Sequence, residues 1–282
     1  MHRPPHHPFP SEKLWQGHVR VQEGDSPLIL SLPHIGTMID PKTSTTLNDL
    51  GRSVPDTDWW LDRLYGDIAM ALDATMVSAG MSRFVIDVNR DPSGQSLYPG
   101  RNTTGLCPLT TFDNLPIYHD GAEPDLTEIK RRRDAYHVPY HSALAEEITR
   151  IKAMHGMCVL YDCHSIRSVI PFLFEGELPV FNIGTNDGRS CAPEIADAAQ
   201  SEAAASGMSH VVNGRFKGGW ITRHYGNPAQ DVHALQMELV QSAYLHEAPP
   251  WSYRTDRAAK TEPVLARIIT RMLDVASRLK RS

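Results

Sequence analysis

Two histidines follow apolar runs that predict buried strands, and both are candidate metal ligands. His34 comes two residues after Leu28–Leu32, and His164 comes three residues after Val159–Tyr161. In open α/β sheets, ligands bind beyond the carboxyl ends of strands. Neutral imidazole is the commonest ligand for Zn²⁺, and catalytic zinc sites combine three protein ligands with a position for water. The pair therefore predicts a zinc ion that activates water, and a structural role for each histidine alone stays open.

The third ligand of such a site is a carboxylate in many enzymes. The candidates in this chain are Asp58, Asp56, Asp40 and Asp162. Neither an HExxH nor a CxxC pattern is present to decide among them. The spacing of the residues leaves the third ligand open.

Ser165 and Cys163 offer a different chemistry, nucleophilic catalysis. A nucleophile elbow needs Gly-x-Ser-x-Gly, and Asp162–Ser165 lacks both glycines. Cys163 and His164 are neighbours on a predicted strand, so their side chains face opposite sides. We therefore expect Cys163 to be a buried structural residue.

Glu238 ends the predicted strand Val232–Glu238. A carboxylate at this position can act as the general base on a metal-bound water. A surface carboxylate is the alternative interpretation. The residue is therefore a candidate catalytic base.

Several polar residues could bind the carboxylates of a substrate. Asn89 and Arg90 follow the apolar run Phe84–Val88, Arg101 lies in a long irregular segment, and Arg223 precedes His224. The guanidinium fork matches a carboxylate through two parallel hydrogen bonds. Arginines gathered at one rim would suit a substrate with more than one carboxylate, whereas each alone also fits a surface ion pair.

Predicted strands alternate with predicted helices, which indicates an α/β fold with helices on both faces of a sheet. Helices are expected over residues 59–79, 126–137, 140–154 and 193–206, with a last helix that starts near Thr261 and a break or kink at Pro139. Strands are expected over residues 28–32, 83–88, 157–162, 209–213 and 232–238. We expect a tail or edge element over residues 1–25 and a single domain over residues 26–282.

The composition is that of an ordinary globular protein. The 282 residues are 41% hydrophobic and 22% charged, and the net charge is −5. Without a long basic run, nucleic acid is not an expected partner. Without a stretch of about 18 apolar residues or a secretory leader, a membrane is not expected either. We expect a cytoplasmic protein whose four cysteines are reduced.

The ordered set of motifs resembles the N-formylglutamate amidohydrolases, the deformylases of histidine breakdown. The motifs are Ser-Leu-Pro-His-Ile-Gly at 31–36, Asp-Thr-Asp-Trp at 56–59, Asp-Val-Asn-Arg-Asp-Pro at 87–92, Asp-Cys-His-Ser at 162–165, the run from Gly214 to Gly226, and Val-His-Ala-Leu-Gln-Met-Glu at 232–238. The resemblance covers residues 26–275.

The resemblance implies a fold related to the zinc carboxypeptidases (phosphorylase/hydrolase-like), with a mixed central sheet between helices. It also implies a metal held by His34, Asp58 and His164, with Glu238 as base and Asn89, Arg90, Arg101 and Arg223 as candidates for positioning the substrate. Thr37 stands where the carboxypeptidase pattern has a glutamate ligand, so the third ligand of this chain departs from that pattern.

The implied reaction is the hydrolysis of N-formyl-L-glutamate to formate and L-glutamate, the last step of a histidine degradation route. The implied cofactor is Zn²⁺ or another divalent transition metal. Two alternatives stay open. One is a related deacylase of N-formylaspartate or an N-acetyl amino acid, and the other is an inactive binding protein on the same fold.

Overall fold

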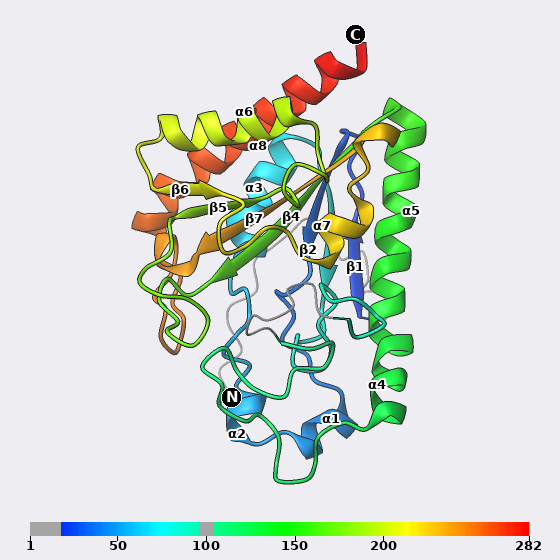
Figure 1. The fold of residues 1–282 in the computed structure, drawn as a ribbon, viewed down its shortest axis with the longest axis vertical. Coiled ribbons are helices and arrows are strands. Elements are labelled where there is room, and N and C mark those ends of the chain that lie inside the picture. Colours follow the sequence, from blue (N-terminus) through cyan, green and yellow to red (C-terminus); the bar gives the residue numbers. More distant parts are fainter. Residues whose placement is uncertain (1–17, 96–103, 282) are drawn as a thin grey trace.

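A seven-stranded mixed sheet forms the centre of the computed structural model, which describes residues 18–95 and 104–281 (Figure 1). The strands are β1 (Val19–Gln22), β2 (Leu28–Leu32), β3 (Thr75–Ala79), β4 (Cys158–Ile166), β5 (Phe181–Gly184), β6 (His210–Val212) and β7 (Val232–Val240). Their order in the sheet is β1-β3-β2-β4-β7-β5-β6. The inner strands β3, β2, β4 and β7 run parallel, whereas β1 and β5 pair antiparallel with β3 and β7.

Helices cover both faces of the sheet, which confirms the expected α/β architecture (Figure 1). The helices are α1 (Pro41–Thr46), α2 (Asp49–Arg52), α3 (Leu61–Ala71), α4 (Leu126–Arg132), α5 (Val138–His155), α6 (Pro193–Ala205), α7 (Trp220–Tyr225) and α8 (Thr255–Arg281). Alternation along β2 divides the core: Leu28 and Leu30 face α3, α6 and α8, whereas Ile29 faces α5. The parallel strands are therefore buried on both faces.

The chain between residues 59 and 79 forms a helix and a strand, so the single predicted helix is wrong. Helix α3 ends at Ala71, and Asp73 adopts a positive φ of 49° that turns the chain out of the helix. β3 then pairs in parallel with β2. Met76 in this strand is buried in the core and happens to continue the helical spacing of the apolar residues in α3, which explains the wrong prediction.

The predicted strand over residues 83–88 is also wrong. This run is buried, but its backbone forms turn-type bonds, such as Val85 N–H to the carbonyl of Ser82 at 2.9 Å. Its apolar side chains are buried without any pairing of its backbone in the sheet.

Strand β4 is longer than predicted, and His164 lies inside this strand instead of beyond its end.

Of the break or kink predicted at Pro139, the break is absent. Helices α4 and α5 continue into each other through a wide π-helical turn, Arg133–His137. The last helix, α8, begins at Thr255, so the predicted start near Thr261 is wrong, and Pro263 lies in its interior. The hydroxyl of Thr261 donates to the carbonyl of Ala243 instead of capping a helix. None of the helices in the two described ranges is long and apolar enough to span a bilayer.

Candidate metal centre and active site

Three candidate ligands from separate segments converge beside the parallel strands. His34 lies two residues beyond β2, His164 lies in the adjacent β4, and Asp58 lies just before α3. The backbone N–H of Asp58 donates to the carbonyl of His34 at 3.0 Å, which ties these two segments together. One ligand atom from each residue lies within 4.8 Å of the others.

The arrangement of these atoms fits a cation. The Nδ1 atoms of His34 and His164 face each other at 3.2 Å, and Oδ2 of Asp58 lies 3.7 Å and 3.3 Å from them. The Asp58 carboxylate is 1% exposed, yet neither of its oxygens has a hydrogen-bond partner among the described residues. Burial acts to raise the pKa of Asp58, but the two imidazoles outweigh it and lower this pKa to about 2. A buried, ionised carboxylate beside two imidazoles is a donor set that Zn²⁺ favours.

Two further carboxylates support the far sides of the imidazole rings. Oδ1 of Asp87 lies 2.7 Å from Nε2 of His34, and Oδ2 of Asp162 lies 3.1 Å from Nε2 of His164. The Asp87 carboxylate accepts from Nε2 of His34, which favours the tautomer that leaves Nδ1 of His34 free for a metal. Asp162 also accepts a hydrogen bond from Ser31 at 2.9 Å. Asp162 is therefore placed as a support for a ligand and not as a ligand.

The remaining aspartates considered from the sequence lie apart from this group. Asp40 caps α1 by accepting from Thr43, and Asp56 accepts from the backbone N–H of Phe112 at 2.7 Å. Of the four aspartates considered, only Asp58 joins the two histidines.

Asn89 bridges His164 and the start of α7. Its Nδ2 lies 2.9 Å from Nε2 of His164, and its Oδ1 accepts from the backbone N–H of Ile221 at 2.9 Å. A Cβ on Gly219 would lie 2.3 Å from this Nδ2, so only glycine allows the amide to sit here. These contacts position Asn89 against the candidate ligand His164 as well as in the pocket wall.

Glu238 is the neighbour of His164 across the β4–β7 ladder. It is 7% exposed, and burial raises its pKa to about 7, against the opposing effect of His164. Gln236 donates to its Oε2 at 3.1 Å and accepts from the backbone N–H of Gly219 at 2.6 Å. One carboxylate oxygen of Glu238 is thus held by protein, and the residue lines the pocket.

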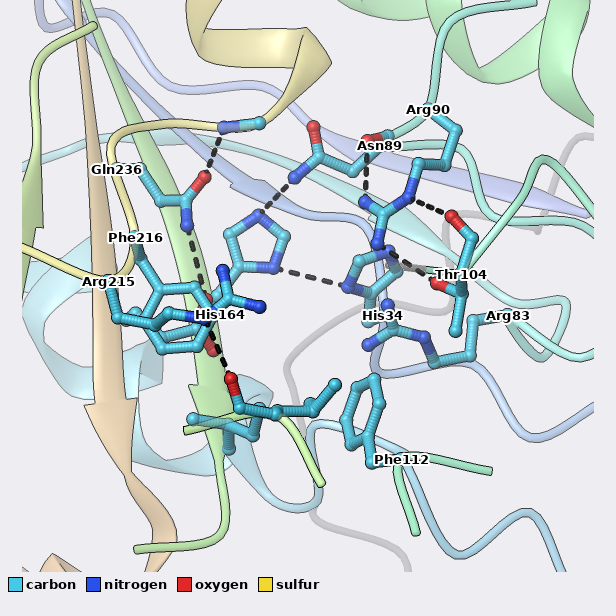
Figure 2. Close-up of a pocket in the computed structure, with 14 residues that line it drawn as sticks. His34, Arg83, Asn89, Arg90, Thr104, Phe112, His164, Arg215, Phe216 and Gln236 are labelled. Carbon is cyan, nitrogen blue, oxygen red and sulfur yellow. Dashed lines mark hydrogen bonds between the residues drawn. The ribbon is translucent and has the colours of Figure 1, made fainter. Parts of the chain in front are cut away.

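A cavity gives access to these groups, and Figure 2 shows the residues that line it. Besides His34, His164 and Glu238, three arginines and several apolar side chains line it: Arg83, Arg90, Arg215, Phe112, Ile166, Leu173 and Phe216. The cavity therefore combines a candidate metal centre, a buried carboxylate and several cationic groups.

The three arginines are held in different ways. Arg83 is 6% exposed and binds Asp87 at 2.8 Å, and Arg90 lies 3.6 Å from the same carboxylate. Burial acts to raise the pKa of Asp87, but Arg90, His34 and Arg83 hold it well below its usual range. Arg215 donates its Nε to the carbonyl of Leu173 at 3.1 Å. Two guanidinium groups therefore share one carboxylate next to His34.

Two further arginines were expected to bind the substrate, Arg223 and Arg101. Arg223 lies in α7, donates its Nε to the carbonyl of Gly218 at 2.9 Å, and is not among the residues lining the cavity. Arg101 lies outside the described residues.

Sequence reasoning missed Arg83, Asp87, Arg215 and Gln236. Arg83 and Asp87 were assigned to a strand, although their i,i+4 spacing matches an ion pair. Arg215 and Gln236 lie in two of the motifs that carry the resemblance, so those motifs contained a signal that was not used.

The α/β sheet and the buried His-Asp-His group at its edge are typical of metal-dependent hydrolases. The family model described as N-formylglutamate amidohydrolase matches residues 26–245, and the chain belongs to this family. The N-formylglutamate deformylase of Pseudomonas putida is 46% identical over 252 residues, which are 89% of this chain and 94% of that protein. The protein of the same name from Pseudomonas aeruginosa is 46% identical over 253 residues, with the same coverage.

Two solved structures share the fold. A crystal structure of N-formylglutamate amidohydrolase from Ralstonia eutropha JMP134 superimposes with a TM-score of 0.75 at 23% identity, over 94% of this chain and 99% of that one. A gene product from Agrobacterium tumefaciens gives a TM-score of 0.71 at 20% identity, over 92% and 95% of the two chains.

Proposed function

We propose that this chain hydrolyses N-formyl-L-glutamate to formate and L-glutamate, with Zn²⁺ or another divalent transition metal held by His34, Asp58 and His164. The observation that carries the proposal is the buried Asp58 carboxylate, which faces two imidazole Nδ1 atoms and has no hydrogen-bond partner within the described part of the chain. The names of the two Pseudomonas relatives support this substrate. A cytoplasmic enzyme at the last step of a histidine degradation route is part of the same proposal.

The metal supplies one kind of chemistry. A bound divalent ion lowers the pKa of a coordinated water toward about 7 and polarises a carbonyl oxygen. The protein keeps His34 ready for it, because Asp87 accepts the Nε2 proton of His34 and the Nδ1 lone pair then points toward Asp58. Asp162 lies 3.1 Å from Nε2 of His164 and supports the position of that ring.

Glu238 carries the proton during hydrolysis. Its carboxylate takes a proton from the attacking water and gives it to the nitrogen of the leaving amine. A pKa of about 7 suits a group that must both accept and donate near neutral pH. Gln236 holds one oxygen of Glu238, which leaves the other oxygen for the proton transfers.

The arginines bind the two carboxylates of the substrate. Arg83 and Arg90 share Asp87 and lie next to His34, so their shared positive charge suits the carboxylate nearest the scissile amide. Arg215 is anchored to Leu173 in another part of the wall and suits the distal carboxylate. Apolar side chains such as Phe112 and Phe216 fill the space between charged groups and favour a small acyl group.

The test is formate or acid release across a substrate panel, with and without a chelator. We expect fast cleavage of N-formyl-L-glutamate, slower cleavage of N-formyl-L-aspartate and N-acetyl-L-glutamate, and loss of activity with the chelator that zinc restores. Equal rates for N-acetyl-L-glutamate and N-formyl-L-glutamate would favour the broader deacylase instead.

Zinc analysis separates an enzyme from an inactive binding protein. The leader contains His2, His6 and His7, which could bind metal without forming an active site. Replacing these three histidines with alanine in the full chain should leave one zinc ion per chain. If the zinc disappears with the leader histidines, the proposed centre is wrong.

A further inference from the structure

The segment 85–90 carries three groups of the candidate site but belongs to no helix or strand. Asp87 contacts His34, Asn89 contacts His164, and Arg90 lines the cavity. Neither a sheet ladder nor a helix fixes the backbone of this segment. Its buried carbonyl groups must therefore find partners elsewhere.

Two histidines of the neighbouring helix bind carbonyls on either side of Asn89. Nε2 of His141 lies 2.7 Å from the carbonyl of Val88, and Nε2 of His137 lies 3.0 Å from the carbonyl of Arg90. Their rings pack together with centroids 4.3 Å apart. Two side chains on one face of the helix therefore bind the backbone on both sides of Asn89.

His141 is fixed as a neutral donor. A carbonyl only accepts, so Nε2 must carry the proton toward Val88. Nδ1 lies 3.0 Å from the hydroxyl of Tyr225, which also donates to the carbonyl of His141 at 3.1 Å. Burial, with a smaller contribution from His137, lowers the pKa of His141 to about 3. The ring therefore keeps this hydrogen-bonding pattern at neutral pH.

A third side chain of the same helix holds the start of the segment. Nη1 of Arg132 donates to the carbonyl of Val85 at 3.1 Å, and Arg132 is 1% exposed. Residues five apart on a regular α-helix, such as Arg132 and His137, point about 140° away from each other. Between them lies the π-helical turn, in which the N–H of Val138 bonds the carbonyl of Arg133. The wider turn reduces this angle, and both side chains reach the segment, as their contacts with the carbonyls of Val85 and Arg90 show.

Pro139 explains why the helix tolerates this turn. In a straight α-helix, residue 139 would donate to the carbonyl of Ala135, but proline has no N–H to give. A regular helix is therefore already disfavoured at this point, and the wider turn keeps the helix continuous.

We propose that the π-helical turn Arg133–His137 serves the reaction by bringing Arg132, His137 and His141 into register as a clamp on the segment 85–90. The clamp residues are positioning residues, because they act through the backbone and not on the substrate. The segment in turn sets the places of Asp87, Asn89 and Arg90.

The test compares His137→Leu and His141→Leu with His137→Gln and His141→Gln in the full chain. Leucine removes the donor, whereas the glutamine amide can reach the same carbonyl. We expect the leucine variants to lose at least about tenfold in kcat/KM or zinc affinity, as loss of an outer support of a metal site does. We also expect faster hydrogen exchange in residues 85–90, and the glutamine variants should recover most of each change.

His155→Leu is the matched control. His155 lies on the same helix, and its Nε2 also binds a backbone carbonyl, that of Asp25 at 2.6 Å. Asp25 does not belong to the segment 85–90. This variant should leave kcat/KM, zinc affinity and exchange over residues 85–90 unchanged. Wild-type values in both leucine variants, or equal losses in the control, would overturn the clamp.

The catalytic readout rests on the proposed function, but hydrogen exchange does not. If the wild-type protein released no formate from N-formyl-L-glutamate, the proposed function would fail, and the exchange rates would still decide whether the clamp exists.

Discussion

Asp87 approaches His34 to 2.7 Å and thereby determines which nitrogen of the imidazole faces Asp58. The same carboxylate binds Arg83 at 2.8 Å, so it connects the candidate metal centre to the cationic wall of the cavity. The ligand set and the substrate-binding set therefore depend on one buried side chain.

Replacing this carboxylate should weaken metal binding. In Asp87→Asn, we expect zinc affinity to fall by about tenfold to a hundredfold, because His34 loses the acceptor that favours its metal-binding tautomer. Competition with a chromogenic chelator measures the change. Asp120→Asn, at an exposed position, should keep wild-type affinity. An unchanged affinity in Asp87→Asn would remove Asp87 from the support of the site.

Glu238→Gln should separate metal binding from turnover. The glutamine has the same shape and its oxygen can still accept from Gln236, but it cannot carry a proton. We expect kcat to fall by about a hundredfold to ten-thousandfold with zinc content unchanged. Loss of the metal in this variant would show that Glu238 is a ligand.

Arg215→Gln should affect only substrates with a distal carboxylate. We expect kcat/KM for N-formyl-L-glutamate to fall by about tenfold to a hundredfold, the effect of losing a charged hydrogen bond. N-formyl-L-norleucine, which lacks that carboxylate, should change little. Arg189→Gln, at an exposed position, is the control. An equal loss for both substrates would mean that Arg215 supports the pocket and does not recognise the carboxylate.

Asp56 should make stability depend on pH. Burial raises its pKa from 3.8 to about 6, although Arg83 opposes this effect. Between these values the folded protein holds a proton that the unfolded chain has released, so stability falls as pH rises through this window. Above pH 6 the ionised carboxylate costs roughly 3 kcal/mol, and Asp56→Asn removes that cost while still accepting from Phe112.

Thermal unfolding of chelator-treated protein measures this effect. The Tm of Asp56→Asn minus that of the wild type should increase from pH 4 to pH 7, whereas Asp120→Asn should give a constant difference. A difference that stays flat or shrinks with pH would contradict the raised pKa of Asp56.

The convergence of His34 and His164 could be predicted from the sequence, because residues near the carboxyl ends of adjacent parallel strands meet at one edge of the sheet. The sequence could not predict that Asp58, and not Asp56, lies beside the two histidines. The two aspartates are two positions apart in one loop, and the conformation of that loop determines which carboxylate faces the histidines. The irregular run 83–88 was mistaken for a strand, since burial produces the same apolar pattern with or without sheet pairing. That mistake concealed the ion pair between Arg83 and Asp87.

The sequence also could not predict which segment the helix over residues 126–155 contacts. Pro139 indicated a disturbance but not its form, because a proline can end, bend or widen a helix. Only the three-dimensional placement of His137 and His141 shows what the wider turn contacts.

The hydrogen bond from the peptide N–H of Asp58 to the carbonyl of His34 has one more consequence. Two of the three candidate ligands are joined through their main chains, so folding of this loop places both side chains before any ion binds. Removal of a bound ion should therefore leave His34 and Asp58 next to each other, ready to bind an ion again.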